Sequence, residues 1–96
     1  ESWSMLGRIH THLDSLDEAA VAYRRALSQS TQNTHYMYNL AEILLVNGQS
    51  AIDAGNPNIG SSQWIEAKKL LENVILLKPG HHKAKARLTQ LAELSK

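Results

Sequence analysis

The chain has 96 residues, of which 43% are hydrophobic and 20% are charged, with a formal net charge of +1 and no cysteine. This length is typical of one domain and excludes a two-domain enzyme, and the composition is that of a folded globular chain. The small net charge gives no field that would steer the protein to nucleic acid or to an anionic membrane. The lack of cysteine excludes disulfides, thiolate nucleophiles and Cys-ligated zinc.

The ends of the chain and its hydropathy bear on its cellular setting. The N-terminus, Glu1-Ser2-Trp3, has no initiator methionine and no signal-peptide pattern, so we expect a domain of a longer protein. No apolar run approaches the roughly 18 residues of a membrane-spanning helix, which predicts no direct membrane insertion. Cytoplasm and periplasm both stay open as compartments.

Apolar residues spaced by three and four predict two helices at the start of the chain. The first begins at Trp3 and ends near Leu13, and the second begins near Leu16. Ser15 and Glu18 have the spacing of a capping box, in which each side chain satisfies a free backbone N–H at a helix start.

Helical periodicity then continues in three further segments. The third helix is expected over about 34–47, with Gly48 as its stop. Residues 49–62 are polar and rich in Gly, Asn and Ser, which predicts a loop. A fourth helix runs from Trp64 to Pro79-Gly80, and a fifth follows over about 81–95. The sequence therefore predicts five helices and no strand.

These helices form an internal repeat. The first helix recurs in the third at an offset of 34 residues, as Trp3, Leu6, Gly7 and His10 become Met37, Leu40, Ala41 and Leu44. The second recurs in the fourth at an offset of 48, as in Tyr23 and Leu71, so a 14-residue insertion lies between Gly48 and Gln63. Leu88 follows Leu40 by 48 residues, which makes the fifth helix the start of a third unit.

Thirty-four residues is the period of the tetratricopeptide repeat, and the chain resembles that family. Trp3-x2-Leu6-Gly7-x2-His10 matches its W-x2-L-G-x2-Y pattern with His for Tyr, Ala19-x3-Tyr23 matches A-x3-F/Y, and Lys78-Pro79 closes the second unit. The chain departs from the pattern at Asp14, at Thr31 and in the insertion.

The resemblance implies an all-α fold, a right-handed helical solenoid that forms a single domain over residues 1–96. Its first repeat would span about 1–33 and its second about 34–80, with the loop 49–62 inserted. A capping helix over about 81–95 would close the stack.

In this family the first helix of each unit lines a concave groove that binds a partner peptide. Carried over by position, the peptide-binding residues would be Arg8, His12, Tyr38, Asn39, Glu42, Lys83 and Arg87. Asn39, Lys83 and Arg87 match the carboxylate clamp of chaperone co-factors, whereas Ser4 and Arg8 depart from it. The alternative is an ordinary solvated face, because exposed Lys and Arg side chains commonly only face water.

A second, narrower resemblance concerns bacterial cytochrome c maturation proteins. Trp3-x2-Leu6-Gly7-Arg8, the run Ala22-Tyr23-Arg24-Arg25-Ala26-Leu27, and Ala41-Glu42 ahead of a long insertion are similar to the TPR domains of those proteins. Such domains bind C-terminal segments of apocytochromes, so an apocytochrome-binding chaperone domain is one alternative function.

No catalytic or metal-binding constellation stands out. His10 and His12 lie about 200° apart around a helix and cannot converge on one ion. The chain has no His-Glu-x-x-His, P-loop, dinucleotide or nucleophile-elbow motif. Trp3 and Trp64 fall at positions that pack helix against helix, so we expect both rings in the core rather than stacked on a ligand.

We therefore expect a binding module rather than an enzyme, with no metal and no cofactor. Its partner would be a peptide or helix of another protein, held in the groove, with a C-terminal carboxylate as a candidate ligand. A scaffolding or self-association segment, pairing through its open stacking faces, is the alternative.

Overall fold

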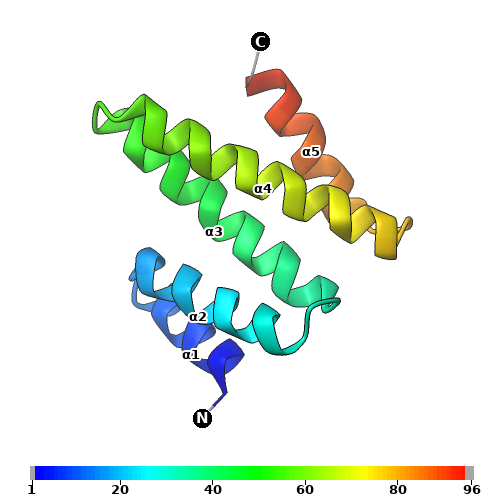
Figure 1. The fold of residues 1–96 in the computed structure, drawn as a ribbon. Coiled ribbons are helices and arrows are strands. Elements are labelled where there is room, and N and C mark those ends of the chain that lie inside the picture. Colours follow the sequence, from blue (N-terminus) through cyan, green and yellow to red (C-terminus); the bar gives the residue numbers. More distant parts are fainter. Residues whose placement is uncertain (1, 95–96) are drawn as a thin grey trace.

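The computed structural model describes residues 2–94 and contains five α-helices within them (Figure 1). In chain order these are α1 (Trp3–His12), α2 (Leu16–Gln29), α3 (Thr34–Asp53), α4 (Pro57–Leu77) and α5 (His82–Leu94). The described residues contain no strand, so the expected all-helical class is confirmed. Residue 95, the expected end of the last helix, lies outside this range.

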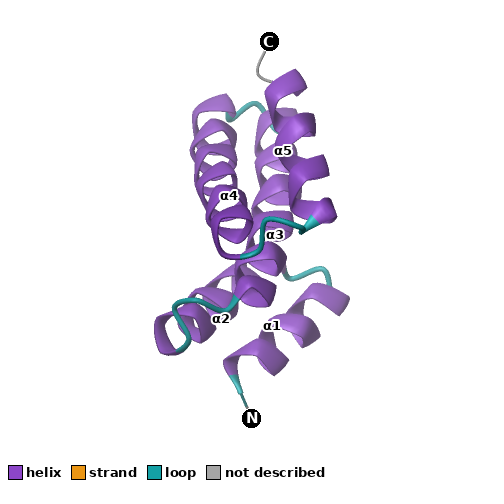
Figure 2. Ribbon diagram, turned by 90° about the vertical axis from the view of Figure 1, so that its right-hand side faces the viewer, coloured by secondary structure: helices purple, strands orange, loops and turns teal. Residues whose placement is uncertain are grey.

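Helices that follow one another in the chain pack side by side. Figures 1 and 2 show α3 and α4 as a long antiparallel pair, with the shorter α1–α2 pair on one side and α5 on the other. Helices α2, α3 and α4 therefore each pack against two neighbours, whereas α1 and α5 pack mainly against one.

The hydrophobic core lies between α2, α3 and α4. Its largest fully buried side chains are Leu40, Leu44, Leu71 and Val74. Fully burying such a side chain contributes roughly 1.5–3 kcal/mol. Ala19, Ala41 and Ala67 are 0% exposed and allow the helices to approach closely.

The connection between α1 and α2 consists of residues 13–15, with Asp14 in a left-handed conformation (φ 58°). The Ser15 N–H donates to the His10 carbonyl at 2.8 Å, and the Asp14 N–H donates to the Thr11 carbonyl at 3.1 Å. These are the two hydrogen bonds of a Schellman motif.

The predicted capping box is wrong, although the helix boundaries near Leu13 and Leu16 are confirmed. Ser15 lies at the N-cap of α2 but its side chain makes no capping hydrogen bond. Glu18 has no free N–H to satisfy, because the backbone N–H of Ser15 already donates to the end of α1.

The predicted loop over 49–62 is also wrong, because both neighbouring helices extend into it. Helix α3 continues to Asp53 and α4 begins at Pro57, so residues 54–56 alone connect them. Gly55 has φ 89°, the Asn56 N–H donates to Ala51 O at 2.8 Å, and the Gly55 N–H donates to Ile52 O at 3.0 Å. This turn repeats the geometry of residues 13–15, with Gly55 in the place of Asp14.

The insertion is divided equally between the two helices. Shifted by 34 and 48 residues, the end of α1 at His12 and the start of α2 at Leu16 correspond to Val46 and Trp64. Helix α3 ends seven residues after Val46 and α4 begins seven residues before Trp64. The insertion therefore adds about two turns to each helix.

Gly48 was predicted to end the third helix, and this prediction is wrong, because α3 continues to Asp53. Gly48 instead allows α3 and α4 to touch. A Cβ atom on Gly48 would lie 2.5 Å from Cδ1 of Trp64, and one on Gly60 would lie 2.5 Å from the carbonyl oxygen of Gly48. Two glycines on facing helices thus permit close backbone contact, which explains their presence within helices.

Candidate functional site

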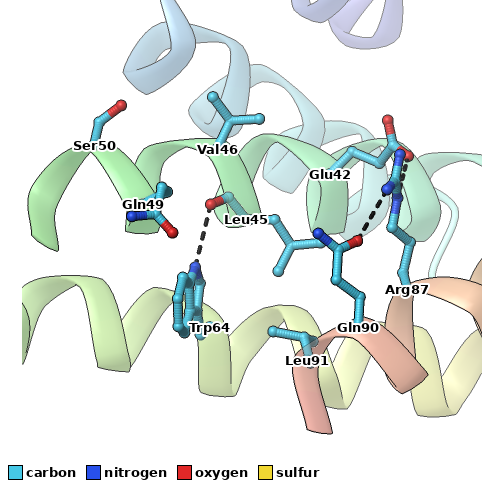
Figure 3. A pocket seen from close by; sticks show the side chains of 9 residues that line it. All are labelled: Glu42, Leu45, Val46, Gln49, Ser50, Trp64, Arg87, Gln90 and Leu91. Atoms are coloured by element: carbon cyan, nitrogen blue, oxygen red, sulfur yellow. Dashed lines mark hydrogen bonds and ion pairs between the residues drawn. The ribbon is translucent and has the colours of Figure 1, made fainter. Parts of the chain in front are cut away.

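Two adjacent depressions lie on either side of Glu42, and we call the surface they form the α3 face. The first, the α1–α3 depression, has a volume of about 430 Å³ and is lined by Arg8, Thr11, His12, Tyr23, His35, Asn39, Glu42 and Ile43. The second, the α3–α5 depression, has a volume of about 340 Å³ (Figure 3) and is lined by Glu42, Leu45, Val46, Gln49, Ser50, Trp64, Arg87, Gln90 and Leu91.

The α1–α3 depression is rich in hydrogen-bond donors. The amide nitrogen of Asn39 lies 3.2 Å from Nε2 of His35 and 3.5 Å from the Tyr23 hydroxyl. Burial raises the pKa of Tyr23, against the opposing effects of the Asn39 hydrogen bond and the Arg8 charge. The exposed side chains of Arg8, His12 and His35 complete a site suited to an anionic group.

The α3–α5 depression combines an apolar floor with polar edges. The indole N–H of Trp64 donates to the carbonyl of Leu45 at 3.2 Å, which fixes the ring against α3 (Figure 3). Val46, 54% exposed, also lines this depression, and the amides of Gln49 and Gln90 add polar groups to it. Such a surface suits an apolar side chain together with the backbone of a bound segment.

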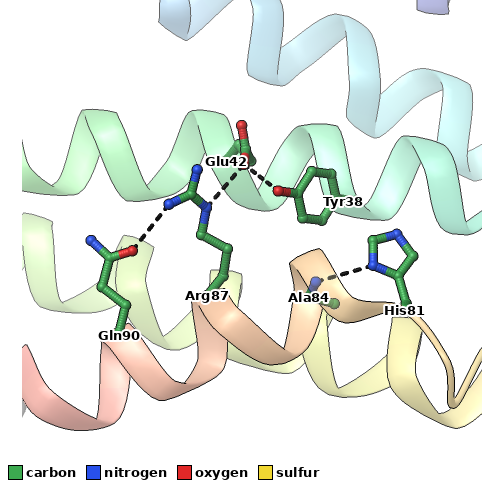
Figure 4. A network of polar contacts seen from close by, with 6 residues as sticks. All are labelled: Tyr38, Glu42, His81, Ala84, Arg87 and Gln90. Atoms are coloured by element: carbon green, nitrogen blue, oxygen red, sulfur yellow. Dashed lines mark hydrogen bonds and ion pairs between the residues drawn. The ribbon is translucent and has the colours of Figure 1, made fainter.

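Glu42 joins the two depressions through a polar network (Figure 4). One carboxylate oxygen of Glu42 accepts hydrogen bonds from the Tyr38 hydroxyl and, at 3.0 Å, from Nε of Arg87. Nη1 of Arg87 also donates to Oε1 of Gln90 at 3.1 Å. The network therefore links α3 to α5.

This network alters the acid–base behaviour of Tyr38 and Arg87. Burial, followed by the hydrogen bond to Glu42 and its charge, raises the pKa of Tyr38. Hydrogen bonds to Glu42 and Tyr38 raise the pKa of Arg87. The side chains of Arg87 and Glu42 are 42% and 38% exposed, so solvent limits the ion pair to at most about 1 kcal/mol.

The residues predicted from repeat position fall into three groups. Arg8, His12 and Asn39 line the α1–α3 depression, and Tyr38, Glu42 and Arg87 form the network. Lys83 is exposed one turn before Arg87 and lines neither depression, while the Ser4 hydroxyl lies 3.2 Å from that of Ser2.

The three residues that match the carboxylate clamp do not form one cluster. Asn39 lines one depression and Arg87 lines the other, with Glu42 between them. Because Glu42 already engages Arg87, a carboxylate that bound Asn39 and Arg87 together would have to displace it.

Sequence reasoning missed two of the lining residues that matter here. His35 lies four residues before Asn39, and this spacing on one helix face would have identified it. Gln90 lies three residues after Arg87 on α5, and the same kind of spacing would have identified it.

One leucine position of the repeat is more exposed at both ends of the helix stack than in its middle. Leu6, Leu40 and Leu88 occupy the same repeat position, yet Leu40 is 2% exposed and the other two are half-buried. Trp3 is 37% exposed under the guanidinium of Arg25, 5.4 Å from the ring centre, so its expected place in the core is wrong.

The structure of residues 2–94 also bears on metal binding and on membrane crossing. Within this range no three His, Asp or Glu side chains are grouped so as to hold a metal ion. None of the five helices has both the length and the apolarity needed to cross a bilayer.

Comparison of the chain with protein-family models and with curated proteins found no match.

Proposed function

We propose that this chain is a tetratricopeptide-repeat domain without catalytic activity that binds a segment of a partner protein along the α3 face. The repeat is supported by burial at equivalent positions of α2 and α4. Ala19 and Ala67 are each 0% exposed, and Tyr23 and Leu71 are 3% and 0% exposed. The regular sequence offsets are thus accompanied by equivalent roles in packing.

One observation carries the binding proposal: a donor-rich depression adjoins a partly apolar one, and Glu42 borders both. An extended segment that lies across α3 would place an anionic group near Arg8 and an apolar side chain near Trp64. Charged hydrogen bonds would fix the orientation of the segment, and apolar burial would contribute to its affinity.

The anionic group that we propose is the C-terminal carboxylate of the partner. Arg8, His12 and His35 are exposed, whereas Arg87 is already paired with Glu42. Arg8 and Asn39 are therefore the first donors that a carboxylate would meet, and Arg87 would contribute after release from Glu42.

The test is a binding titration against peptides from protein C-termini, including those of apocytochromes c, each with a free and an amidated terminus. We expect amidation to abolish binding, and Arg8→Ala or Asn39→Ala to weaken it about tenfold, since a hydrogen bond to a charged group contributes about 1.5 kcal/mol or more. Lys85→Ala is the matched control, because Lys85 is exposed on α5 and lines neither depression. Binding that responds to neither amidation nor these variants would contradict the carboxylate proposal.

Two half-buried leucines, one at each end of the stack, favour self-association as a second candidate function. Leu6 at one end and Leu88 at the other are more exposed than their buried counterpart Leu40, and apolar end faces of a repeat stack bind further helices. Sedimentation over a wide concentration range tests this candidate. A mass that rises with concentration and falls back in Leu88→Glu supports it, and a constant monomer mass contradicts it.

A further inference from the structure

Helix α5 begins with an unusual cap, in which a histidine side chain is the acceptor. Nδ1 of His81 accepts a hydrogen bond from the backbone N–H of Ala84 at 3.0 Å (Figure 4). The carbonyl of His81 accepts from the N–H of Lys85 at 3.2 Å, which is the first hydrogen bond of the helix. His81 thus occupies the N-cap position, where Ser, Thr, Asp and Asn are the usual residues.

The same imidazole also packs against α3. Its ring centre lies 5.1 Å from that of Tyr38, and the Tyr38 hydroxyl donates to Glu42, which binds Arg87. His81 and Arg87 therefore attach two successive turns of α5 to one patch of α3, as Figure 4 shows. The position of Arg87 depends on both attachments.

The cap requires one protonation state of His81. An imidazole nitrogen accepts a hydrogen bond only when it carries no proton, so the cap exists with Nδ1 unprotonated. A proton on Nδ1 removes the acceptor and places positive charge at a helix N-terminus, where the helix dipole is already positive.

Among residues 2–94, no carboxylate forms an ion pair with His81 that would compensate such a charge. The Tyr38 ring on α3 packs against His81, and the titratable residues next to His81 in the chain are all basic: Lys78 at the end of α4, and His82, Lys83 and Lys85 on α5. Glu42 lies beyond Tyr38 and is engaged by the Tyr38 hydroxyl and Arg87. The Tyr38 ring attracts a cation weakly but gives the Ala84 N–H no replacement acceptor.

We propose that His81 is a pH-sensitive positioning residue, which holds the start of α5, and with it Arg87, against α3 only while its Nδ1 is unprotonated. Histidine side chains change charge near pH 6.5, at about the acidity that separates neutral from mildly acidic compartments. Because Arg87 lines the α3 face, pH would also control the binding of a partner there, and this part of the proposal rests on the proposed function. The cap itself does not depend on that function.

Amide hydrogen exchange measured by NMR at about pH 7.5 and about pH 5.5 tests the cap without any partner. In the unmodified protein we expect the protection factors of Ala84, Lys85 and Ala86 to fall about three- to fivefold at the lower pH, relative to those of α3. The protection of the Arg87 Nε–H, taken relative to its intrinsic exchange rate at each pH, should also fall, because Arg87 is less firmly held against Glu42.

Three variants assign the effect to the His81 side chain. His81→Asn supplies a cap that does not titrate and should keep high protection at both pH values. His81→Ala should show low protection at both. His82→Asn removes the neighbouring exposed histidine and should behave like the unmodified protein.

The proposal is overturned if α5 protection in the unmodified protein does not change with pH, or if His81→Asn retains the change. Loss of the change in His82→Asn would overturn it as well. If His81→Ala fails to fold, the comparison of His81→Asn with His82→Asn still decides. A failure to find a binding peptide would bear on the proposed function alone, because this measurement uses no ligand.

Discussion

Asp14 and Gly55 occupy the same position in two turns of the same geometry, but only one of them is glycine. Both have positive φ, 58° and 89°, a region in which a side chain costs roughly 1–2 kcal/mol. Asp14→Gly should therefore raise the free energy of unfolding by about 1 kcal/mol, and Gly55→Ala should lower it by a similar amount. Urea denaturation measures both, and a destabilised Asp14→Gly would contradict the assigned turn.

The raised pKa of Tyr38 predicts that the folded protein loses stability at alkaline pH. Its pKa is raised in the folded protein by burial and by Glu42, so the unfolded chain loses this proton first as the pH rises. The stability that Tyr38 contributes is therefore complete below about pH 10 and declines above it.

The measurement is the free energy of unfolding as a function of pH. Tyr38→Phe should reduce the slope of the decline above about pH 10. Part of the decline should persist, because burial also raises the pKa of Tyr23. An unchanged slope in Tyr38→Phe would show that Tyr38 titrates alike in the folded and unfolded states.

Glu42 competes with any anionic partner for Arg87. Glu42→Gln removes that competition and should raise the affinity for a carboxylate-bearing peptide up to about fivefold, as expected for an exposed ion pair of at most about 1 kcal/mol. Glu66→Gln is the matched control, because it breaks the comparably exposed pair with Arg24, and neither residue lines the α3 face. Weaker binding by Glu42→Gln would mean that Glu42 itself contacts the partner.

At the scale of helices, the contact between α3 and α4 depends on two glycines. A methyl group on Gly60 would meet the backbone carbonyl of Gly48, and one on Gly48 would meet the Trp64 indole. Gly60→Ala and Gly48→Ala should each destabilise the fold by about 2–3 kcal/mol. Gly80→Ala is the control, since a Cβ atom on Gly80 would have nothing within 4 Å and no loss is expected. Thermal denaturation of the three variants measures these effects, and a loss at Gly48 and Gly60 would run against the higher helix propensity of alanine.

Periodicity predicted the helices well, but composition misled for residues 49–62. Gly, Asn and Ser are typical of loops, and the rule that applies this composition takes no account of tertiary contacts. Here Gly48 and Gly60 serve the approach of two helices, and Trp64 packs against the gap that Gly48 leaves. The glycines were interpreted as loop residues, whereas the facing helix requires a residue without a side chain at these positions.

The candidate site was predictable only where it depends on repeat position. Arg8, His12 and Asn39 were predicted from their repeat positions, and they line one depression together. The pairing of Glu42 with Arg87 joins residues 45 positions apart and depends on how α5 crosses α3. The crossing angle between α3 and α5 cannot be predicted from the spacing of residues within either helix.

For the whole molecule, the arrangement predicts an order of local unfolding. Helix α3 carries the fully buried Leu40 and Leu44 and packs against two neighbours, whereas α5 packs mainly against α4. Native-state hydrogen exchange should be slowest at the amides of Leu44 and Leu71 and faster throughout α5. Equal protection of α3 and α5 would indicate a single cooperative unit.

The insertion adds seven residues to α3 and seven to α4, and this number preserves the direction in which the side chains of each helix point. Seven residues rotate a helix by about 700°, only about 20° short of whole turns. Side chains before and after the added length therefore point in nearly the same direction as in an uninterrupted repeat, and the connecting turn is the same. The α3–α4 hairpin can change length in steps of about seven residues per helix while its faces stay aligned, whereas a step of five would rotate them by about 140°.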